Sequence, residues 1–275
     1  MRISLALLLL TAAPAYPQDT TPESELDTAT RATISRGFAF VVKSNAGLPD
    51  GFPQDRLALA GTTVHGEYAD GAYHAKDGVY EIYKKKSMTL VRSERGWLPI
   101  DQFTSPLKVE IAQAFDERDG RLWRRGNVTA GRKAVNQLIQ ISHLDHRTDI
   151  EHLTRLQQAL MDLKVVRIPS LNGKPATLYE GEIAETVAFD ILQGPFGSLV
   201  ERGNLAFRNV SGVGRIYLQD GLVRRVVLRV AGAYSAYDDT DNVKRRGTCT
   251  LDVTAELSRY GEVRVELPRE AALLK

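Results

Sequence analysis

Paired turn residues constrain the fold of this chain more than any other feature. Five Asp-Gly or Asn-Gly pairs punctuate the sequence, and most of them separate runs in which apolar and polar residues alternate. These dipeptides readily adopt the positive φ angles that two-residue hairpin turns require. The pairs are Asp70-Gly71, Asp77-Gly78, Asp119-Gly120, Asn172-Gly173 and Asp220-Gly221. They predict a succession of β-hairpins, and therefore a mainly antiparallel sheet.

The segment from Thr248 to Ser258 shows the alternation most clearly. Cys249, Leu251 and Val253 share one face of the expected strand, and threonines and acidic residues share the other. One dry face and one wet face are typical of an antiparallel sheet. We expect Cys249 on the buried face, and a further strand over 263–267 that closes the sheet after a turn.

Three segments have the apolar spacing of helices. They are Glu23–Lys43, Thr148–Leu163 with a leucine stripe, and the shorter Ala184–Leu192. A four-stranded meander is expected between Val64 and Ser93, and a turn then leads to Trp97.

The N-terminus has the pattern of a secretory signal. A basic residue precedes a short apolar run, and Ala13-Pro14-Ala15 offers the small side chains that signal peptidase needs. The run is shorter than the roughly 20 residues that span a bilayer, so we expect no stable membrane insertion. The sequence thus predicts a signal peptide over 1–15, a flexible leader over 16–22, and a single domain over 23–275. The mature protein should be soluble and periplasmic or secreted.

The charge balance argues against one class of function, and the cysteine content excludes one kind of stabilisation. The chain has 36 basic and 34 acidic side chains, so it lacks the dominant basic field of a nucleic-acid-binding protein. A hydrophobic fraction of 43% is sufficient for a large core. With one cysteine, no intrachain disulfide can form, and core packing and sheet hydrogen bonds must stabilise the exported protein.

No cluster of residues predicts catalysis or metal binding. His143, His146 and His152, with Asp145, could ligate zinc, but their spacing matches no established zinc motif. A polar connector that leads into a helix is the preferred interpretation. No Gly-x-Ser-x-Gly nucleophile elbow is present. We therefore expect a non-enzymatic protein without metal or cofactor.

The order of the expected elements and the sequences of several of them resemble one protein family. The meander ends in GVYEIYKKKSMTLVRSERGW, a helix leads to LNGKPATLYEGEI, and the chain closes with ELSRYGEVRVELP. From Val64 to Leu273 this resembles the LolA-like and LppX-like half-barrel proteins of bacterial envelopes. The resemblance implies a strongly curved antiparallel sheet whose concave face is covered by helices.

The same resemblance implies a binding function. We expect an envelope protein that binds or carries a lipid or acyl chain between the curved sheet and its helices. Concave, largely apolar sites are typical of such ligands. The side chains expected to line this space are Phe38, Trp97, Leu153, Leu156 and Leu160. The alternative is a non-catalytic module with a filled core that binds an unidentified envelope protein.

Overall fold

The structure is a computed structural model that describes residues 21–47, 63–94, 96–118, 121–147, 151–194, 205–237, 243–269 and 271. Within these residues, one antiparallel sheet contains 11 strands in the order β6-β5-β4-β3-β2-β1-β13-β12-β11-β10-β9. A separate hairpin pairs β7 (Phe115–Arg118) with β8 (Arg121–Arg124). The strands of the large sheet are β1 (Phe38–Gly47), β2 (Thr63–Ala69), β3 (Ala72–Lys76), β4 (Glu81–Lys85), β5 (Met88–Ser93), β6 (Gly96–Pro99), β9 (Leu160–Leu171), β10 (Lys174–Ile183), β11 (Leu205–Gln219), β12 (Leu222–Tyr237) and β13 (Val243–Ser258).

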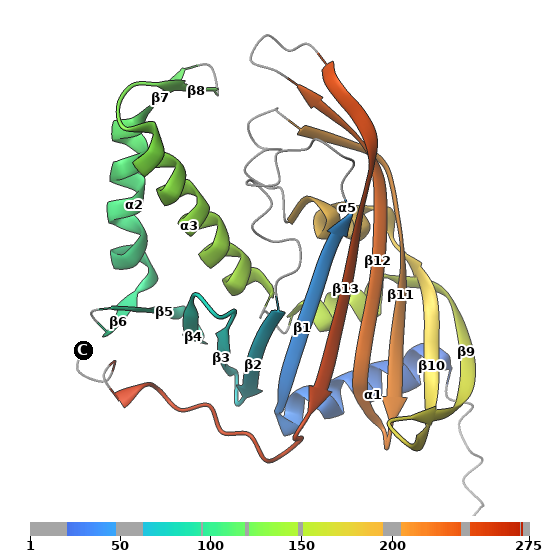
Figure 1. Ribbon diagram of the computed structural model, residues 1–275. Helices are drawn as coiled ribbons and strands as arrows, with labels where there is room; N and C mark the ends of the chain where they lie inside the picture. The colour runs from blue at the N-terminus through green and yellow to red at the C-terminus, as the bar shows by residue number, and fades with distance from the viewer. Residues whose placement is uncertain are drawn as a thin grey trace, which may run out of the picture.

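The predicted fold class is confirmed. The sheet is curved and open, and α1, α4 and α5 lie behind its long strands in Figure 1. These helices share one continuous core with the facing side of the sheet, to which each contributes buried side chains. The helices are α1 (Pro22–Arg36), α2 (Ile100–Ala114), α3 (Val128–Arg147), α4 (Glu151–Ala159) and α5 (Glu185–Gln193).

The first helix is shorter than the sequence predicted. It begins at the N-cap Thr21, whose side chain accepts a hydrogen bond from the Ser24 amide, and ends at Arg36 instead of Lys43. Gly37 has φ 67° and ψ 158°, a conformation that is essentially restricted to glycine and that no helix can contain. Phe38 therefore begins strand β1, where alternate side chains are buried against the helices.

The second predicted helix also ends early. It covers Glu151–Ala159, and Leu160 and Leu163 belong to strand β9 instead. Leu160 pairs with Ile183 of β10, so the strand ladder satisfies backbone groups that the helix was expected to satisfy. Thr148, where this helix was expected to begin, and the expected signal peptide lie outside the described residues.

Two helices and one irregular segment were not expected. Helices α2 and α3 pack against each other and form an arm with the β7–β8 hairpin (Figure 1). Pro106 lies inside α2, and contact with α3 compensates for the poor helix signal of such a sequence. Residues 263–267 were predicted as a strand but have no regular secondary structure. Val265, Leu267 and Ala271 instead pack against β3–β6.

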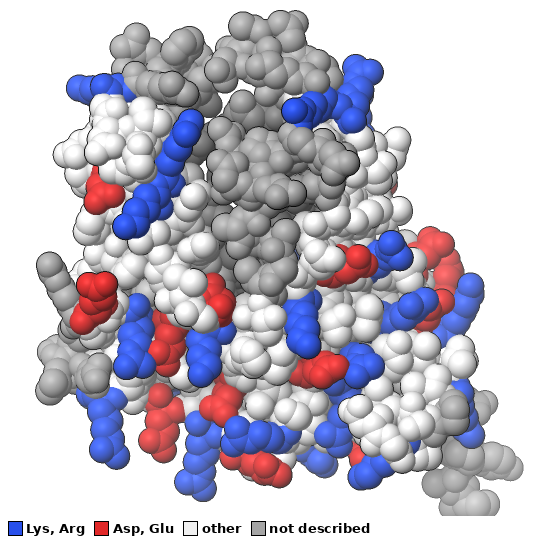
Figure 2. All heavy atoms as spheres, viewed as in Figure 1, with Lys and Arg blue, Asp and Glu red and all other residues white. Residues whose placement is uncertain are grey.

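Over the long strands β9–β13, the face of the sheet opposite the helices is polar. Cross-strand ion pairs on it join Glu180 to Arg215, Arg225 to Glu256 at 2.8 Å, and Arg229 to Asp252 at 3.6 Å. Figure 2 shows basic and acidic side chains interspersed over the lower part of this face. This arrangement fits the near-neutral net charge and gives one wet face, as the alternating pattern predicted. No helix of the described part is long and apolar enough to cross a membrane.

The strand phase predicted for Cys249 is confirmed, because its side chain is fully buried. Burial raises the pKa of the thiol to about 11, so the reactive thiolate is scarce at neutral pH. Thiol reagents should therefore label Cys249 only after denaturation, and Cys249→Ser should destabilise the protein by about 1–3 kcal/mol. Labelling with and without guanidinium checks this, and rapid labelling of the native protein would contradict it.

Candidate functional site

The space between the helices and the sheet is filled by side chains. Leu26 of α1, Ile141 of α3, Tyr179 of β10 and Leu192 of α5 are all at most 1% exposed in one cluster. Helix α5 approaches the sheet so closely that a Cβ atom on Gly232 would lie 2.8 Å from Leu192 Cδ2. Leu192 and Val210 would both have to shift to admit even a methyl group at this position. The described interior is therefore a packed core.

The five side chains expected to line a ligand space occupy two different clusters. Phe38, Leu156 and Leu160 are buried in the main core, and Leu153 packs against its margin. Trp97 is buried in a second cluster between the outer side of β3–β6 and the C-terminal residues, so it does not face the helices. The expectation for Trp97 was wrong because strand β6 turns this side chain to the opposite face, beside His74.

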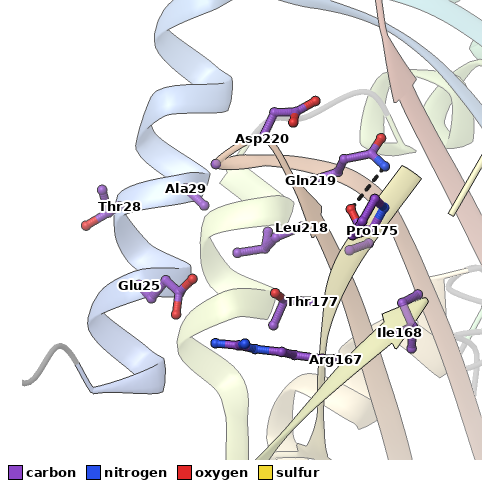
Figure 3. A pocket seen from close by; sticks show the side chains of 12 residues that line it. Glu25, Thr28, Ala29, Arg167, Ile168, Pro175, Thr177, Leu218, Gln219 and Asp220 are labelled. Carbon is purple, nitrogen blue, oxygen red and sulfur yellow. Dashed lines mark hydrogen bonds between the residues drawn. The ribbon is translucent and has the colours of Figure 1, made fainter. Parts of the chain in front are cut away.

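Two open grooves lie at the margins of the core. The first, called here the α1 groove, has a volume of about 510 Å³ and lies between α1 and the ends of β9, β10 and β11 (Figure 3). Its apolar wall includes Ala29, Ile168, Ala176 and Leu218. Its charged lining residues are Glu25, Arg167 and Asp220.

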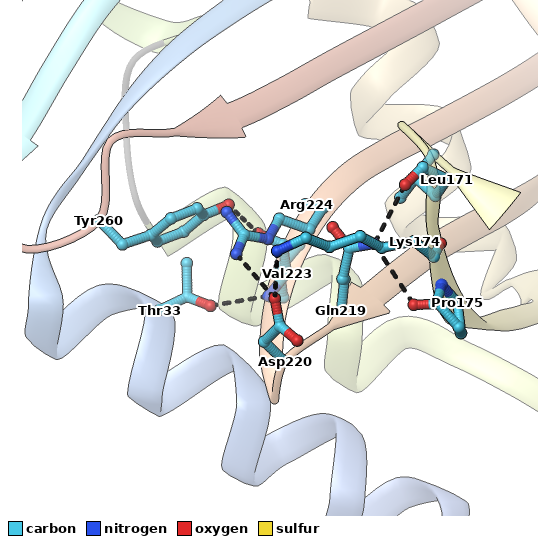
Figure 4. A network of polar contacts seen from close by, with 9 residues as sticks. All are labelled: Thr33, Leu171, Lys174, Pro175, Gln219, Asp220, Val223, Arg224 and Tyr260. Carbon is cyan, nitrogen blue, oxygen red and sulfur yellow. Dashed lines mark hydrogen bonds and ion pairs between the residues drawn. The ribbon is translucent and has the colours of Figure 1, made fainter.

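Hydrogen bonds fix one wall of the α1 groove. The Gln219 amide nitrogen donates to the carbonyl oxygens of Leu171, Lys174 and Pro175 at 3.0–3.3 Å, which holds the β9–β10 turn against β11 (Figure 4). Asp220 lies 3.5 Å from an Arg224 nitrogen and 4.0 Å from Lys174 Nζ. Its carboxylate charge is therefore balanced by the wall itself.

Helix α1 is attached to the same region. The Thr33 hydroxyl accepts a hydrogen bond from the Val223 amide at 2.9 Å (Figure 4). The Tyr260 hydroxyl donates to the Val223 carbonyl oxygen, and the Arg224 guanidinium lies 4.4 Å from the centre of the Tyr260 ring. These contacts set the position of α1 relative to the groove.

Polar groups are also buried near the α1 groove. The hydroxyls of Thr30 and Tyr179 belong to residues at most 1% exposed, and neither has a hydrogen-bond partner of good geometry among the described residues. Burial, with a smaller effect of the Glu25 carboxylate, raises the pKa of Tyr179 far above its usual value. The phenol therefore stays protonated and remains a donor on the groove's Glu25 side.

The second groove, called here the α2 groove, is larger, at about 790 Å³. It lies between α2 and the turns at the ends of β3–β4 and β5–β6. Tyr80 and Phe103 meet edge to face with ring centres 6.1 Å apart. The apolar residues that line the groove are Val79, Tyr80, Leu98, Phe103, Pro106 and Leu107. Val79 is 70% exposed.

A polar cluster lies on the opposite face of β3–β5, on the side of Trp97. Glu81 contacts Arg92 at 2.8 Å and His74 Nε2 at 2.6 Å. Burial alone would raise the pKa of Glu81, but the hydrogen bonds from Arg92 and His74 outweigh it and lower that pKa. The carboxylate is therefore held ionised, next to a half-exposed guanidinium.

No group of three or more potential metal ligands occurs among the described residues. The side chains of His143, Asp145, His146 and His152 lie outside this part of the structure, so the interpretation of this cluster stays a prediction. The residues that line the two grooves were missed by the sequence reasoning. The available signals were an apolar residue directly after a turn at Val79 and a charge inside the apolar run at Arg167.

Comparison with known proteins adds no assignment: no protein-family model matches the chain, and no curated protein matches its sequence.

Proposed function

We propose that this chain is an exported envelope protein that binds an apolar ligand, a lipid or an acyl chain, in the α2 groove. The observation that carries the proposal is the groove itself, with aromatic and aliphatic walls and a volume of about 790 Å³. Small-ligand sites usually measure about 300–1,000 Å³ and combine apolar walls with a few polar groups. Gln102 and Gln137, which also line the groove, supply such groups.

The fold and the N-terminal pattern support this proposal. An open, curved antiparallel sheet covered by helices fits the LolA-like and LppX-like proteins that the sequence resembles. The proposed site differs in place from the one expected, because the space between α1, α4, α5 and the sheet is packed. We therefore place the ligand beside α2 instead. The proposed function is binding, without a chemical step.

Titration with a fluorescent fatty acid tests the proposal. The wild-type protein should bind the probe, and Val79→Asp should weaken binding about tenfold or more, because a charge would enter an apolar wall. Val79 is mostly exposed, so this variant should fold normally. Val213→Asp is the matched control, since Val213 is 41% exposed on the polar face of the sheet and lines neither groove. Equal affinity in both variants, or no binding by the wild type, would contradict the proposal.

A second candidate function rests on the edge strand β9. This strand pairs only with β10 in the described sheet, and it exposes Met161, Val165 and Val166 by 44–48%. Unpaired edges readily accept a strand from another chain. Under this alternative, the protein isolated from its envelope should carry a protein partner that protects the β9 amides from hydrogen exchange, and it should not bind the probe.

A further inference from the structure

Two opposite charges line the α1 groove without forming an ion pair. Glu25 projects from α1 and Arg167 from β9, and Figure 3 shows both side chains extending into the space between the helix and the strands. Among the described residues, no ion pair within 4.0 Å involves either side chain. Exposed pairs do form elsewhere, as between Arg155 and Asp190 at 3.3 Å. Glu25 and Arg167 thus bring opposite charges to one groove without an ion pair between them.

The other polar groups of the groove are already engaged. Asp220 is balanced by Lys174 and Arg224, and the Gln219 amide nitrogen is bound to the β9–β10 turn. The remaining charged groups are the Arg167 guanidinium and the Glu25 carboxylate, which also interacts with the Tyr179 hydroxyl. Between them lies an apolar surface formed by Ala29, Ile168, Ala176 and Leu218.

A buried donor lies on the acidic side. Tyr179 is fully buried, and its hydroxyl has no hydrogen-bond partner of good geometry among the described residues. It follows Thr177, a lining residue, on the same face of β10, and the Glu25 carboxylate acts on it. The Tyr179 hydroxyl is therefore directed toward Glu25 and can help to hold its carboxylate at the groove.

We propose that the α1 groove binds the zwitterionic head of an amphiphile, with a phosphate on Arg167 and an ammonium on Glu25. Guanidinium groups bind phosphate through two parallel hydrogen bonds, and a carboxylate accepts hydrogen bonds from an ammonium. The carbons next to the head lie on Ile168, Ala176 and Leu218. This proposal concerns a different groove from that of the apolar probe and does not depend on it.

Calorimetric titration with three probes tests the proposal. They are dihexanoyl phosphatidylethanolamine below its micelle concentration, dihexanoylglycerol phosphate without the ammonium, and free phosphoethanolamine. The phosphatidylethanolamine should bind best, since only it offers both charges and an apolar part. If free phosphoethanolamine bound more tightly, recognition of the zwitterionic head would still be supported, but the ligand would be a soluble compound and not a lipid. Failure of both zwitterions to bind would overturn the proposal.

Charge-neutral variants locate the site. Arg167→Gln should weaken binding of both phosphate lipids by about tenfold or more, the scale of a lost charged hydrogen bond. Glu25→Gln should weaken binding of the phosphatidylethanolamine but not of the dihexanoylglycerol phosphate, because the latter has no ammonium. Lys164→Gln on β9 and Glu23→Gln on α1 are matched controls that line neither groove and should leave affinity unchanged. All four residues are exposed, so the variants should fold. Equal losses in the variants and their controls would refute the site.

Discussion

Gly37→Ala should destabilise the protein by about 2–5 kcal/mol. Gly37 has φ 67° and ψ 158°, and a Cβ atom there would lie only 2.7 Å from the Tyr68 carbonyl oxygen. A strained backbone of this kind costs about 1–3 kcal/mol, and forcing an atom into packed surroundings costs a similar amount. The obstacle is backbone, so it cannot move aside as a flexible side chain would. Chemical denaturation measures the change.

Gly71→Ala is the matched control for this effect. Gly71 also has a positive φ, 71°, but no atom lies within 4 Å of the position that a Cβ would occupy. The control should therefore be destabilised only by the strain of the left-handed conformation, about 1 kcal/mol. Similar losses in the two variants would show that the contact with Tyr68 has no energetic role.

Leu156→Ala should destabilise the protein by about 2–5 kcal/mol, because it removes a side chain that is 5% exposed and leaves a cavity in the main core. Leu153→Ala, one helical turn earlier on α4, should cost less, since Leu153 is only partly buried at the margin of that core. Urea denaturation of the three proteins gives the comparison.

The same variant distinguishes a packed interior from a ligand-filled one. Leu156 lines neither groove, so Leu156→Ala should bind the fluorescent fatty acid as well as the wild type does. A small stability loss combined with weak probe binding would mean that the ligand occupies the space between α4 and the sheet. That result would contradict our placement of the ligand in the α2 groove.

Hairpin turns were the most predictable part of the fold. Asp70-Gly71, Asn172-Gly173 and Asp220-Gly221 join paired strands with both residues at positive φ. Asp77-Gly78 is a longer connection, in which the Asp77 side chain accepts hydrogen bonds from the amides of Val79 and Tyr80. Asp119-Gly120 lies outside the described residues, although the strands that flank it pair.

Helix boundaries were less predictable because local spacing does not record distant strand partners. Phe38 and Leu160 both continue an apolar pattern that suits a helix, yet each belongs to a strand. The backbone of Phe38 faces Tyr68 of β2, and that of Leu160 faces Ile183 of β10. Pairing with segments distant in sequence decided these positions over local propensity.

The sequence by itself determined an antiparallel sheet with one polar face, its main hairpins and the burial of Cys249, because turn chemistry and alternation act between near neighbours. Only the tertiary structure decided where the two grooves lie and which charges face each other. Glu25 and Arg167 meet in one groove because α1 lies across the ends of β9–β11, and Trp97 leaves the helix side because β6 turns it to the opposite face. Such placements depend on how distant elements pack, and no local pattern contains them.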